Sequence, residues 1–286
     1  MIQRLCIIGV GLIGGSLARA LREAGAVGEV VGAGRNELQL AKAVDLGVVD
    51  RYDTDLPAAV HGCDMVVVAV PLGAMVKVFA AIADHLEPDC VLTDVGSAKG
   101  CVVEDVRRVF GRIPPNFVPG HPIAGTEKSG VEASFPSLFQ NRRVILTPLA
   151  ETHAGAHDKV RCMWQVTGAE VVDMGVRHHD EVLAATSHLP HVLAYALVDS
   201  LARMDDRAEI FRYAAGGFRD FTRIASSDPT MWHDICLANR DCLLEVVAQF
   251  RYDLERLTEA VQRGDSATIM DIFRRAKQAR DNLYRE

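Results

Sequence analysis

The sequence predicts an α/β domain built on a doubly wound parallel sheet, followed by an all-α domain. Over residues 1–176, short runs of apolar and mostly β-branched residues alternate with segments of helical periodicity. That alternation is typical of a parallel sheet covered by helices on both faces. Over residues 177–286 the strand pattern stops and the helical periodicity continues. We therefore expect a first domain at 1–176 and a second at 177–286.

The expected elements follow from local pattern. Strands are expected at apolar runs, at 5–8, 29–31, 65–70, 91–94, 116–118, 144–146 and 171–173. Helices 16–24 and 37–46 each end at a glycine, Gly25 or Gly47, which is a common helix stop. The second domain is expected to contain helices at 180–204, 208–216, 231–263 and 266–284. An apolar stripe from Leu243 to Leu257 predicts that the third of these packs against other helices or a second subunit.

Composition excludes several classes of protein. The chain has 286 residues and a formal net charge of −7, which disfavours a nucleic-acid partner because phosphate binding needs clustered positive charge. Its 7 cysteines form no CxxC pair, so reduced thiols are expected rather than a disulfide framework. No signal-peptide pattern or membrane-length apolar run is present. We expect a cytoplasmic protein with no membrane partner.

The segment GVGLIGGS follows the first strand and opens the first helix. It fits G-x-G-x-x-G, in which glycines permit a tight turn, close approach of a pyrophosphate and close packing of helix on strand. The helix N-terminus then offers free N–H groups to the anion. A Rossmann-type dinucleotide site is predicted. Its expected members in this turn and after the third strand are Gly9, Gly11, Leu12, Ile13, Gly14, Val70 and Pro71.

The end of the second strand bears on the choice of cofactor. A carboxylate usually binds the ribose hydroxyls of NAD at this point, but the sequence reads Gly34, Arg35 and Asn36. The missing carboxylate removes repulsion against a 2′-phosphate, and Arg35 can pair with that phosphate. Arg35 as a solvated surface charge is the alternative. We expect these three residues at the ribose and NAD(P) as cofactor, with a lean toward NADP.

Two polar segments are expected at the carboxyl edge of the sheet, where ligands bind. DVGSAKG ends the fourth strand and places Ser97 and Lys99 at the mouth of the site. Ser97 is also suited to capping the next helix, and both roles can hold together. In PGHPIAGTEKSG, prolines on both sides of His121 predict a stiff loop that holds the imidazole in one geometry. A bystander histidine is the alternative.

The helical half contains further candidates. His188 and His191 in SHLPH are three residues apart and share a helix face. No third ligand with suitable spacing stands nearby, so no metal site is expected, and core packing of one histidine is the alternative. GGFRDFTRIASSDPTMW combines arginines, glycines and an aromatic ring, which favours an anion pocket. Arg219 in that segment is interpreted as a solvated charge.

Together, GVGLIGGS, DVGSAKG, GHPIAGTEKSG, SHLPH and GFRDFTRIASSDPTMW resemble the prephenate/arogenate dehydrogenase family, also called cyclohexadienyl dehydrogenases. The motifs occur in the family's order over nearly the whole chain. The resemblance implies a Rossmann domain followed by a helical dimerisation domain, and so a homodimer. It implies that His121 is catalytic, assisted by Ser97. It also implies a substrate pocket that contains Thr126, His188, His191, Gly216, Arg223 and Trp232.

The implied reaction is oxidative decarboxylation of prephenate to 4-hydroxyphenylpyruvate, or of arogenate to tyrosine. Hydride passes from C4 to the nicotinamide, His121 accepts the hydroxyl proton, and Arg223 pairs with a carboxylate. Activity should then fall at acidic pH. The sequence offers no carboxylate that is evidently placed to bind the ammonium group of arogenate. This favours prephenate, or both compounds, as substrate. The chain ends soon after the last expected helix, so no fused regulatory or mutase domain is expected.

Two alternatives stay open at this point. A β-hydroxyacid dehydrogenase or an imine-type reductase also combines a Rossmann half with a helical half. Such an enzyme would use a lysine or aspartate deep in the helical half, which leaves the SHLPH histidines without a purpose. A non-catalytic nucleotide sensor would use the glycine turn for regulation only.

Overall fold

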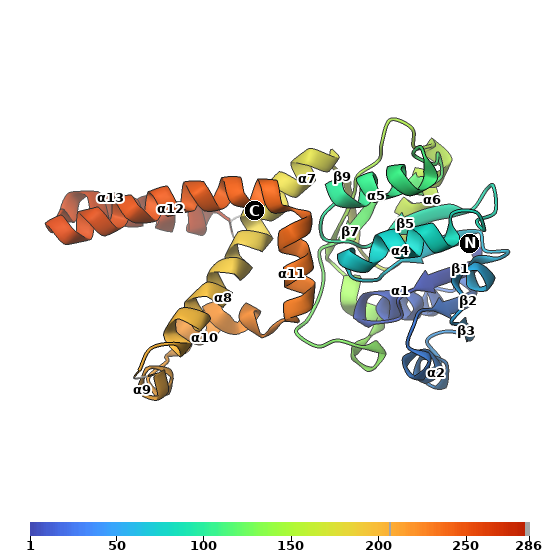
Figure 1. Ribbon diagram of the computed structural model, residues 1–286, viewed down its shortest axis with the longest axis horizontal. Helices are drawn as coiled ribbons and strands as arrows, with labels where there is room; N and C mark the ends of the chain where they lie inside the picture. Colours follow the sequence, from blue (N-terminus) through green and yellow to red (C-terminus); the bar gives the residue numbers. More distant parts are fainter. Residues whose placement is uncertain (206, 284–286) are drawn as a thin grey trace. The chain divides into compact units, whose positions relative to one another are not determined.

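The computed structural model describes residues 1–205 and 207–283. The chain divides into two compact units, Met1–Arg240 and Asp241–Glu286. The first unit contains a six-stranded parallel sheet in the order β3-β2-β1-β4-β5-β6 (Figure 1). Its strands are β1 (Ile2–Ile8), β2 (Val27–Ala33), β3 (Arg51–Asp53), β4 (Met65–Val68), β5 (Val91–Asp94) and β6 (Phe117–Val118).

This strand order confirms the predicted Rossmann-type sheet. The winding direction reverses between β1 and β4, the point at which open α/β sheets bind their ligands. Successive residues of β1 point to opposite faces. Leu5 and Ile7 pack with one set of helices, α1 (Leu12–Glu23), α2 (Glu37–Asp45) and α6 (Ala154–Gln165). Cys6 and Ile8 pack with the other set, α3 (Leu56–Val60), α4 (Leu72–Ile82) and α5 (Gly100–Phe110).

A second sheet of three strands holds β7 (Gly120–Pro122), β8 (Arg143–Leu146) and β9 (Glu170–Asp173). β7 is antiparallel to β8, and β8 is parallel to β9. The expectation that the runs 144–146 and 171–173 extend the main parallel sheet is therefore wrong. The expectation of a stiff loop around His121 is also wrong, because His121 lies in β7 opposite Ile145. Strand pairing, rather than proline alone, holds its backbone.

Between β7 and β8 the chain forms two 3₁₀ turns, η1 (Val131–Ala133) and η2 (Pro136–Phe139). Both pack against α1. Ser134 lies between them, and its Oγ accepts a hydrogen bond from Arg19 Nε at 3.0 Å. The Ser16 hydroxyl in turn accepts the Phe135 N–H at 3.1 Å. The connection that follows the His121 strand is thus anchored to α1, the helix that begins at the glycine turn.

The rest of the first unit is helical, as predicted. Its elements are α7 (Val176–Leu183), the π-helical turn η3 (Ala184–His188), α8 (Leu189–Ala202), α9 (Arg207–Arg212), α10 (Gly216–Thr222), the 3₁₀ turn η4 (Arg223–Ser226) and α11 (Pro229–Ala238). The predicted helix 180–204 thus contains a π-helical turn. This turn immediately precedes α8, whose first turn contains Pro190. Proline has no N–H for the regular helical ladder, so the ladder is interrupted there.

The predicted single helix 231–263 is wrong. It is divided into α11 and α12 (Arg240–Arg263) at Asn239, whose φ of −111° and ψ of 34° lie outside the helical range. The Asn239 side chain is buried and hydrogen-bonded inside the first unit. Periodicity of apolar residues on both sides of the break conceals it in the sequence.

The second unit consists of α12 and α13 (Ser266–Asn282). The chain turns between them at Gly264, which has a φ of +64°, and Asp265 Oδ1 caps α13 by accepting the Thr268 N–H at 3.0 Å. Several large apolar side chains of the unit are exposed, among them Leu254, Val261, Met270 and Phe273. The predicted end of the last helix, Tyr284, lies outside the described residues.

No disulfide joins any of the 7 cysteines in the structure. Within 1–205 and 207–283, no helix has both the length and the apolar character needed to cross a membrane.

Candidate functional site

The glycine turn has the geometry of a dinucleotide site. Gly9 follows β1 with a φ of +102°, and a Cβ there would lie 2.5 Å from Ala69 O. A Cβ on Gly14 would lie 2.4 Å from Gly9 O, so both positions require glycine. A Cβ on Gly11 would meet nothing within 4 Å, so open space lies before it. α1 begins at Leu12, not at Ser16 as predicted, and has no side-chain cap and no acidic first turn.

The predicted residues after the third expected strand lie beside this turn. Ala69 N donates to Ile8 O at 2.7 Å, which brings the ends of β1 and β4 together. A Cβ on Gly9 would also lie 3.1 Å from Val70 Cγ1, and Pro71 then leads into α4. The N–H groups of the first turn of α1, which an α-helix leaves without intrahelical partners, and the open space at Gly11 suit a pyrophosphate. The residues present therefore fit a nicotinamide dinucleotide.

The residues expected at the ribose have a mixed environment. Gly34 and Arg35 follow β2, and Arg35 is exposed. Asn36 caps α2, since its Oδ1 accepts the Gln39 N–H at 3.2 Å. Asn36 thus has a structural role in α2, whereas Arg35 is free to face a ligand or solvent.

A buried ion pair holds the strand that carries His121. Lys99 and Asp94 are fully buried and bind each other through Nζ and Oδ2. Lys99 Nζ also donates to Gly120 O at 2.6 Å, and Asp94 Oδ1 accepts the Gly120 N–H at 3.3 Å. Both backbone groups of the residue before His121 are therefore fixed. The expectation that Lys99 lies at the site mouth is wrong, because its ammonium is paired inside the protein, where an unpaired charge would be strongly destabilising.

Three side chains form a buried hydrogen-bonded row. His121 Nδ1 lies 2.9 Å from His179 Nε2, and His179 Nδ1 lies 2.8 Å from Asp180 Oδ1. The Asp180 carboxylate also accepts the N–H groups of Lys99 and Gly100, each at 2.8 Å. A carboxylate from α7 thus caps α5.

The N-cap interpretation of Ser97 is therefore wrong. The cap position of α5 is Lys99, and no side chain of its own segment fills it. Ser97 is half-buried in the connection between β5 and α5. Its hydroxyl is thus not committed to the end of that helix.

Burial sets the protonation of this row. The pKa of His121 is lowered well below its ordinary value by burial and by the nearby His179, Lys99 and His188. Burial also lowers the pKa of His179, although the hydrogen bond to Asp180 opposes that shift. Burial alone would raise the pKa of Asp180, but its hydrogen bonds with His179 and the two N–H groups outweigh burial and lower it. Both imidazoles are neutral and Asp180 is ionised at neutral pH.

His188 lies in a second part of the same buried cluster. Asn239 Nδ2 is 3.1 Å from His188 Nδ1 and 2.8 Å from Asp180 O. Burial is the main cause that lowers the pKa of His188 to about 4. His188 Nε2 is buried and makes no hydrogen bond of normal geometry among the described residues, although the nearby Ser97 backbone raises the pKa of His188. Leaving a buried donor unpaired costs about 1–3 kcal/mol, so each such atom in a native structure calls for an explanation.

The two SHLPH histidines both contact Trp232. The His191 ring stacks on Trp232 with centroids 3.6 Å apart and an interplanar angle of 19°. The His188 ring meets Trp232 edge-on, with centroids 6.1 Å apart. His191 Nδ1 lies 2.8 Å from Ser187 O. Trp232 Nε1 is another buried N–H with no partner in the described part of the chain, as is Trp164 Nε1 in the core of the α/β domain.

Arg223 lies at a different position. It pairs with Glu127 in the segment that follows β7, and both side chains are partly exposed. Thr126 is exposed and its Oγ1 accepts the Lys128 N–H at 3.2 Å. Gly216 begins α10, and a Cβ there would meet nothing within 4 Å. The structure thus groups His121, His188, His191 and Trp232, and Arg223 of η4 instead pairs with Glu127 of the loop that carries Thr126.

Four residues of this arrangement are absent from the sequence prediction: Glu127, His179, Asp180 and Asn239. Glu127 lies in the GTEKSG segment, and a carboxylate in such a segment is a signal for pairing with an arginine. His179 and Asp180 follow a run of polar residues, VRHHDE, which reads as a solvated helix start. Asn239 is a polar residue between two segments of helical periodicity, and that periodicity conceals the break at which it lies.

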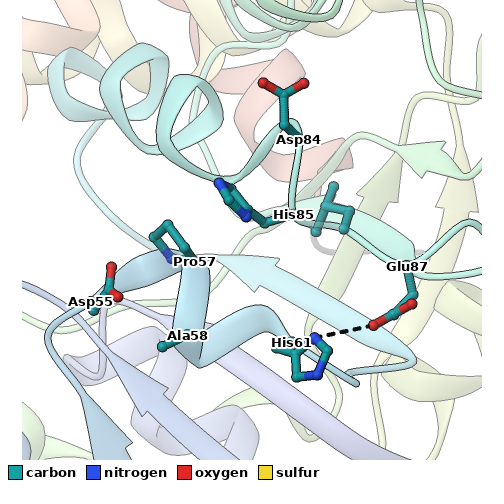
Figure 2. A pocket seen from close by; sticks show the side chains of 8 residues that line it. Asp55, Pro57, Ala58, His61, Asp84, His85 and Glu87 are labelled. Carbon is teal, nitrogen blue, oxygen red and sulfur yellow. Dashed lines mark ion pairs between the residues drawn. The ribbon is translucent and has the colours of Figure 1, made fainter.

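A surface cavity of about 630 Å³ lies elsewhere, at α3 and the segment after α4 (Figure 2). Its lining residues are Asp55, Pro57, Ala58, His61, Asp84, His85, Leu86 and Glu87. His61 Nδ1 lies 3.4 Å from Glu87 Oε1. None of the predicted site residues lines this cavity. Among the described residues, no group of three or more His, Cys, Asp or Glu side chains is arranged to hold a metal ion.

The chain matches known protein families over most of its length. The family model for the nucleotide-binding domain of prephenate dehydrogenase matches residues 17–173, and that for its dimerization domain matches residues 176–275. The chain is 39% identical over 281 residues to a cyclohexadienyl dehydrogenase of Zymomonas mobilis, covering 97% of this chain and 95% of that protein. It is 34% identical over 287 residues to a prephenate dehydrogenase of Bacillus subtilis, covering 99% and 76%.

A crystal structure of prephenate dehydrogenase from A. aeolicus, in complex with hydroxyphenyl propionate and NAD+, matches with a TM-score of 0.92 at 37% identity and covers 99% of both chains. The cofactor in that relative does not support the lean toward NADP. The matches disfavour the hydroxyacid dehydrogenase, imine reductase and nucleotide-sensor alternatives. The chain therefore belongs to the prephenate dehydrogenase family, the oxidoreductases that convert prephenate or arogenate in tyrosine biosynthesis.

Proposed function

We propose that this protein oxidatively decarboxylates prephenate, and arogenate as well, with His121 as the general base. The observation that supports this most is the buried row of His121, His179 and Asp180, which leaves one imidazole nitrogen of His121 available as a base. A nicotinamide dinucleotide bound at the glycine turn supplies the hydride acceptor.

The hydrogen positions in the row follow from its acidic end. The Asp180 carboxylate is acceptor-only when ionised, so His179 Nδ1 donates to it. A neutral His179 then has a lone pair on Nε2, which accepts the N–H of His121 Nδ1. A neutral His121 is left with its lone pair on Nε2. This is the nitrogen that can accept a proton from the C4 hydroxyl of the substrate.

Proton and electron pairs balance without a further reactant. As hydride leaves C4, the hydroxyl proton passes to His121 Nε2 and the C4–O bond gains double-bond character. Loss of the ring carboxylate as CO2 returns an electron pair to the ring, which becomes aromatic. The phenolate oxygen then takes the proton back from His121. The enzyme's main tasks are to keep His121 neutral and to align C4 with the cofactor.

Binding of the substrate is proposed to involve the remaining predicted residues. Arg223 suits a carboxylate because its guanidinium is permanently charged and can bind bidentately. Since Arg223 pairs with Glu127 in this structure, the substrate has to compete with that carboxylate. Thr126, His191, Gly216 and Trp232 are proposed to line the same pocket, and Ser97 to orient the C4 hydroxyl.

The proposal is tested by measuring turnover of prephenate and of arogenate, each with NAD and with NADP, from the absorbance of the reduced nicotinamide. His121→Asn is expected to lower kcat by about 10²-fold or more with a modest change in KM. No turnover of either substrate by the native protein would refute the function. Unchanged kcat in His121→Asn would refute the assignment of the base.

The cofactor preference is a separate question. NAD(P) is proposed, and Arg35 is the residue expected to decide whether a 2′-phosphate is tolerated. Arg35→Ala should lower kcat/KM with NADP and leave kcat/KM with NAD nearly unchanged. Equal effects with both cofactors would show that Arg35 does not contact the phosphate.

A homodimer is proposed through the helical domain, in keeping with the match to a dimerization domain. The exposed apolar side chains of α12 and α13 suit such an interface, because large exposed apolar patches usually mark association sites. Light scattering coupled to size exclusion measures the state directly. A monomer at micromolar concentration would contradict the proposal.

A further inference from the structure

We propose that Asn239 is a positioning residue for this reaction. It holds His188 in the tautomer whose hydrogen is on Nε2, and this makes His188 a neutral hydrogen-bond donor to an acceptor oxygen of the anionic substrate. The tautomer follows from the contacts of Asn239 alone. The identity of the acceptor rests on the proposed function.

The orientation of the Asn239 amide is fixed independently of His188. Asn239 is buried at the break between α11 and α12. Its Nδ2 lies 2.8 Å from Asp180 O, a backbone carbonyl that only accepts hydrogen bonds. The nitrogen, and not the oxygen, of the amide must therefore face Asp180.

The second hydrogen of the same NH2 group determines the state of His188. Asn239 Nδ2 lies 3.1 Å from His188 Nδ1, and because this nitrogen is the donor, His188 Nδ1 has to accept with its lone pair. A neutral imidazole carries one hydrogen, so that hydrogen is on Nε2. The neutral form is the stable one, since burial lowers the pKa of His188 to about 4.

The Nε2–H group of His188 is the one left for a ligand. His188 is 1% exposed, and Nε2 makes no hydrogen bond of normal geometry among the described residues, although the Ser97 backbone lies close enough to raise the pKa of His188. Because solvent does not reach this atom, a substrate contacts it only after neighbouring side chains rearrange. An N–H donor requires an acceptor, and prephenate and arogenate offer carboxylate oxygens that accept without donating.

Neutrality of His188 also protects the proposed base. A positive charge on His188 lowers the pKa of His121 further, as the proximity of the two groups already does. An asparagine at 239 donates to His188 without attracting a proton to it. An aspartate there would accept from Nδ1–H and stabilise the imidazolium form. The amide therefore provides a donor to the substrate and avoids a cation beside His121.

The first test reads the tautomer without substrate. Long-range ¹H–¹⁵N spectra of ¹⁵N-histidine-labelled protein distinguish Nε2–H, Nδ1–H and imidazolium forms, and His188→Gln assigns the signal. We expect the Nε2–H form of His188 between pH 6 and 8. In Asn239→Asp we expect the Nδ1–H or imidazolium form. The matched control is Asn116→Asp, which alters an exposed amide that donates to Pro88 O and should leave the His188 signal unchanged.

An Nδ1–H or charged His188 in the native protein would overturn the proposal, as would an unchanged tautomer in Asn239→Asp. Because these spectra need neither substrate nor cofactor, they decide the tautomer even if the protein proves inactive toward prephenate. The state of Asn239 and the proposed function can thus fail separately.

The second test uses a double-mutant cycle. Loss of one hydrogen bond to the substrate should raise KM for prephenate about 10-fold in Asn239→Asp. In the His188→Gln background no imidazole tautomer exists, so the same substitution should change KM by about 3-fold or less. Equal changes in KM in both backgrounds would show that Asn239 acts on stability or packing rather than through His188.

Discussion

His179 Nε2 lies 2.9 Å from His121 Nδ1 in a contact closed to solvent, and the opposite nitrogen of His179 is bound to Asp180. The two imidazoles lie on different elements, β7 and α7, which are separated by β8, α6 and β9 in the chain. A hydrogen bond of this kind orients the proposed base and determines which of its nitrogens is free. The predictions below concern His179, the pH and Arg223.

His179→Asn is expected to lower kcat by about 10-fold or more, because the donor on His121 Nδ1 loses the acceptor that holds the ring and its tautomer. KM should change little, since His179 is not placed in the substrate pocket. His178→Asn is the matched control, as His178 is the adjacent and exposed histidine of the same helix. Steady-state kinetics of the two variants decide the matter, and equal kcat values would remove His179 from the mechanism.

The pH dependence of activity follows from the lowered pKa of His121. Protonation of His121 Nε2 abolishes the base, so kcat/KM should fall as pH decreases. Because burial shifts that protonation below the ordinary imidazole pKa of about 6.5, the profile should be flat from pH 8 to about 6.5 and fall at lower pH. A decline that is already half complete near pH 7 would indicate a base other than the buried His121.

Stability should also fall on the acidic side. In the unfolded chain, histidines bind protons below about pH 6.5, whereas the pKa values of folded His121, His179 and His188 are lowered, that of His188 to about 4. The unfolded state then binds more protons, so the free energy of unfolding falls between about pH 6.5 and 4, by about 1.4 kcal/mol per pH unit for each neutral histidine. Urea unfolding at pH 7.5, 6 and 5 measures this slope. His188→Gln should reduce the slope, and an unchanged slope would contradict burial of a neutral His188.

Arg223→Ala is expected to raise KM for prephenate by about 10- to 100-fold, the range for one charge-assisted hydrogen bond or ion pair. The change in kcat should be small, because the guanidinium contacts neither C4 nor His121 in the proposed arrangement. Arg219→Ala provides the control, since Arg219 is an exposed arginine of the preceding helix. Similar KM values for the two variants would place Arg223 outside the pocket.

Much of the fold could be predicted because its signals are local. Runs of β-branched residues marked the inner strands, and the glycine turn marked the point at which the sheet binds its ligand. The strand β3 (Arg51–Asp53) was missed, since a short edge strand with exposed residues lacks an apolar run. The second sheet was missed for a different reason. β7 and β8 are paired across an intervening segment, and local sequence pattern does not reveal which strands pair with each other.

The candidate site shows the same limit. His121 and His188 were expected on motif grounds, and the structure brings both into one buried cluster. The residues that orient them, His179, Asp180 and Asn239, are recognisable only from contacts between distant elements. The side chain of Asn239 and the carbonyl of Asp180 are 59 residues apart in sequence. Local pattern cannot reveal such a hydrogen bond.

Lys99 and Asp94 hydrogen-bond both backbone groups of Gly120, and this affects how variants of the enzyme should behave. The proposed base, His121, is anchored from within the core, whereas the chain beyond Ile123, which carries Glu127, is exposed. Substitutions in that exposed segment should therefore change the rates at which the substrate associates and dissociates, and should have little effect on the chemical step. Evolution toward new substrates can therefore alter this segment with little loss of catalytic rate.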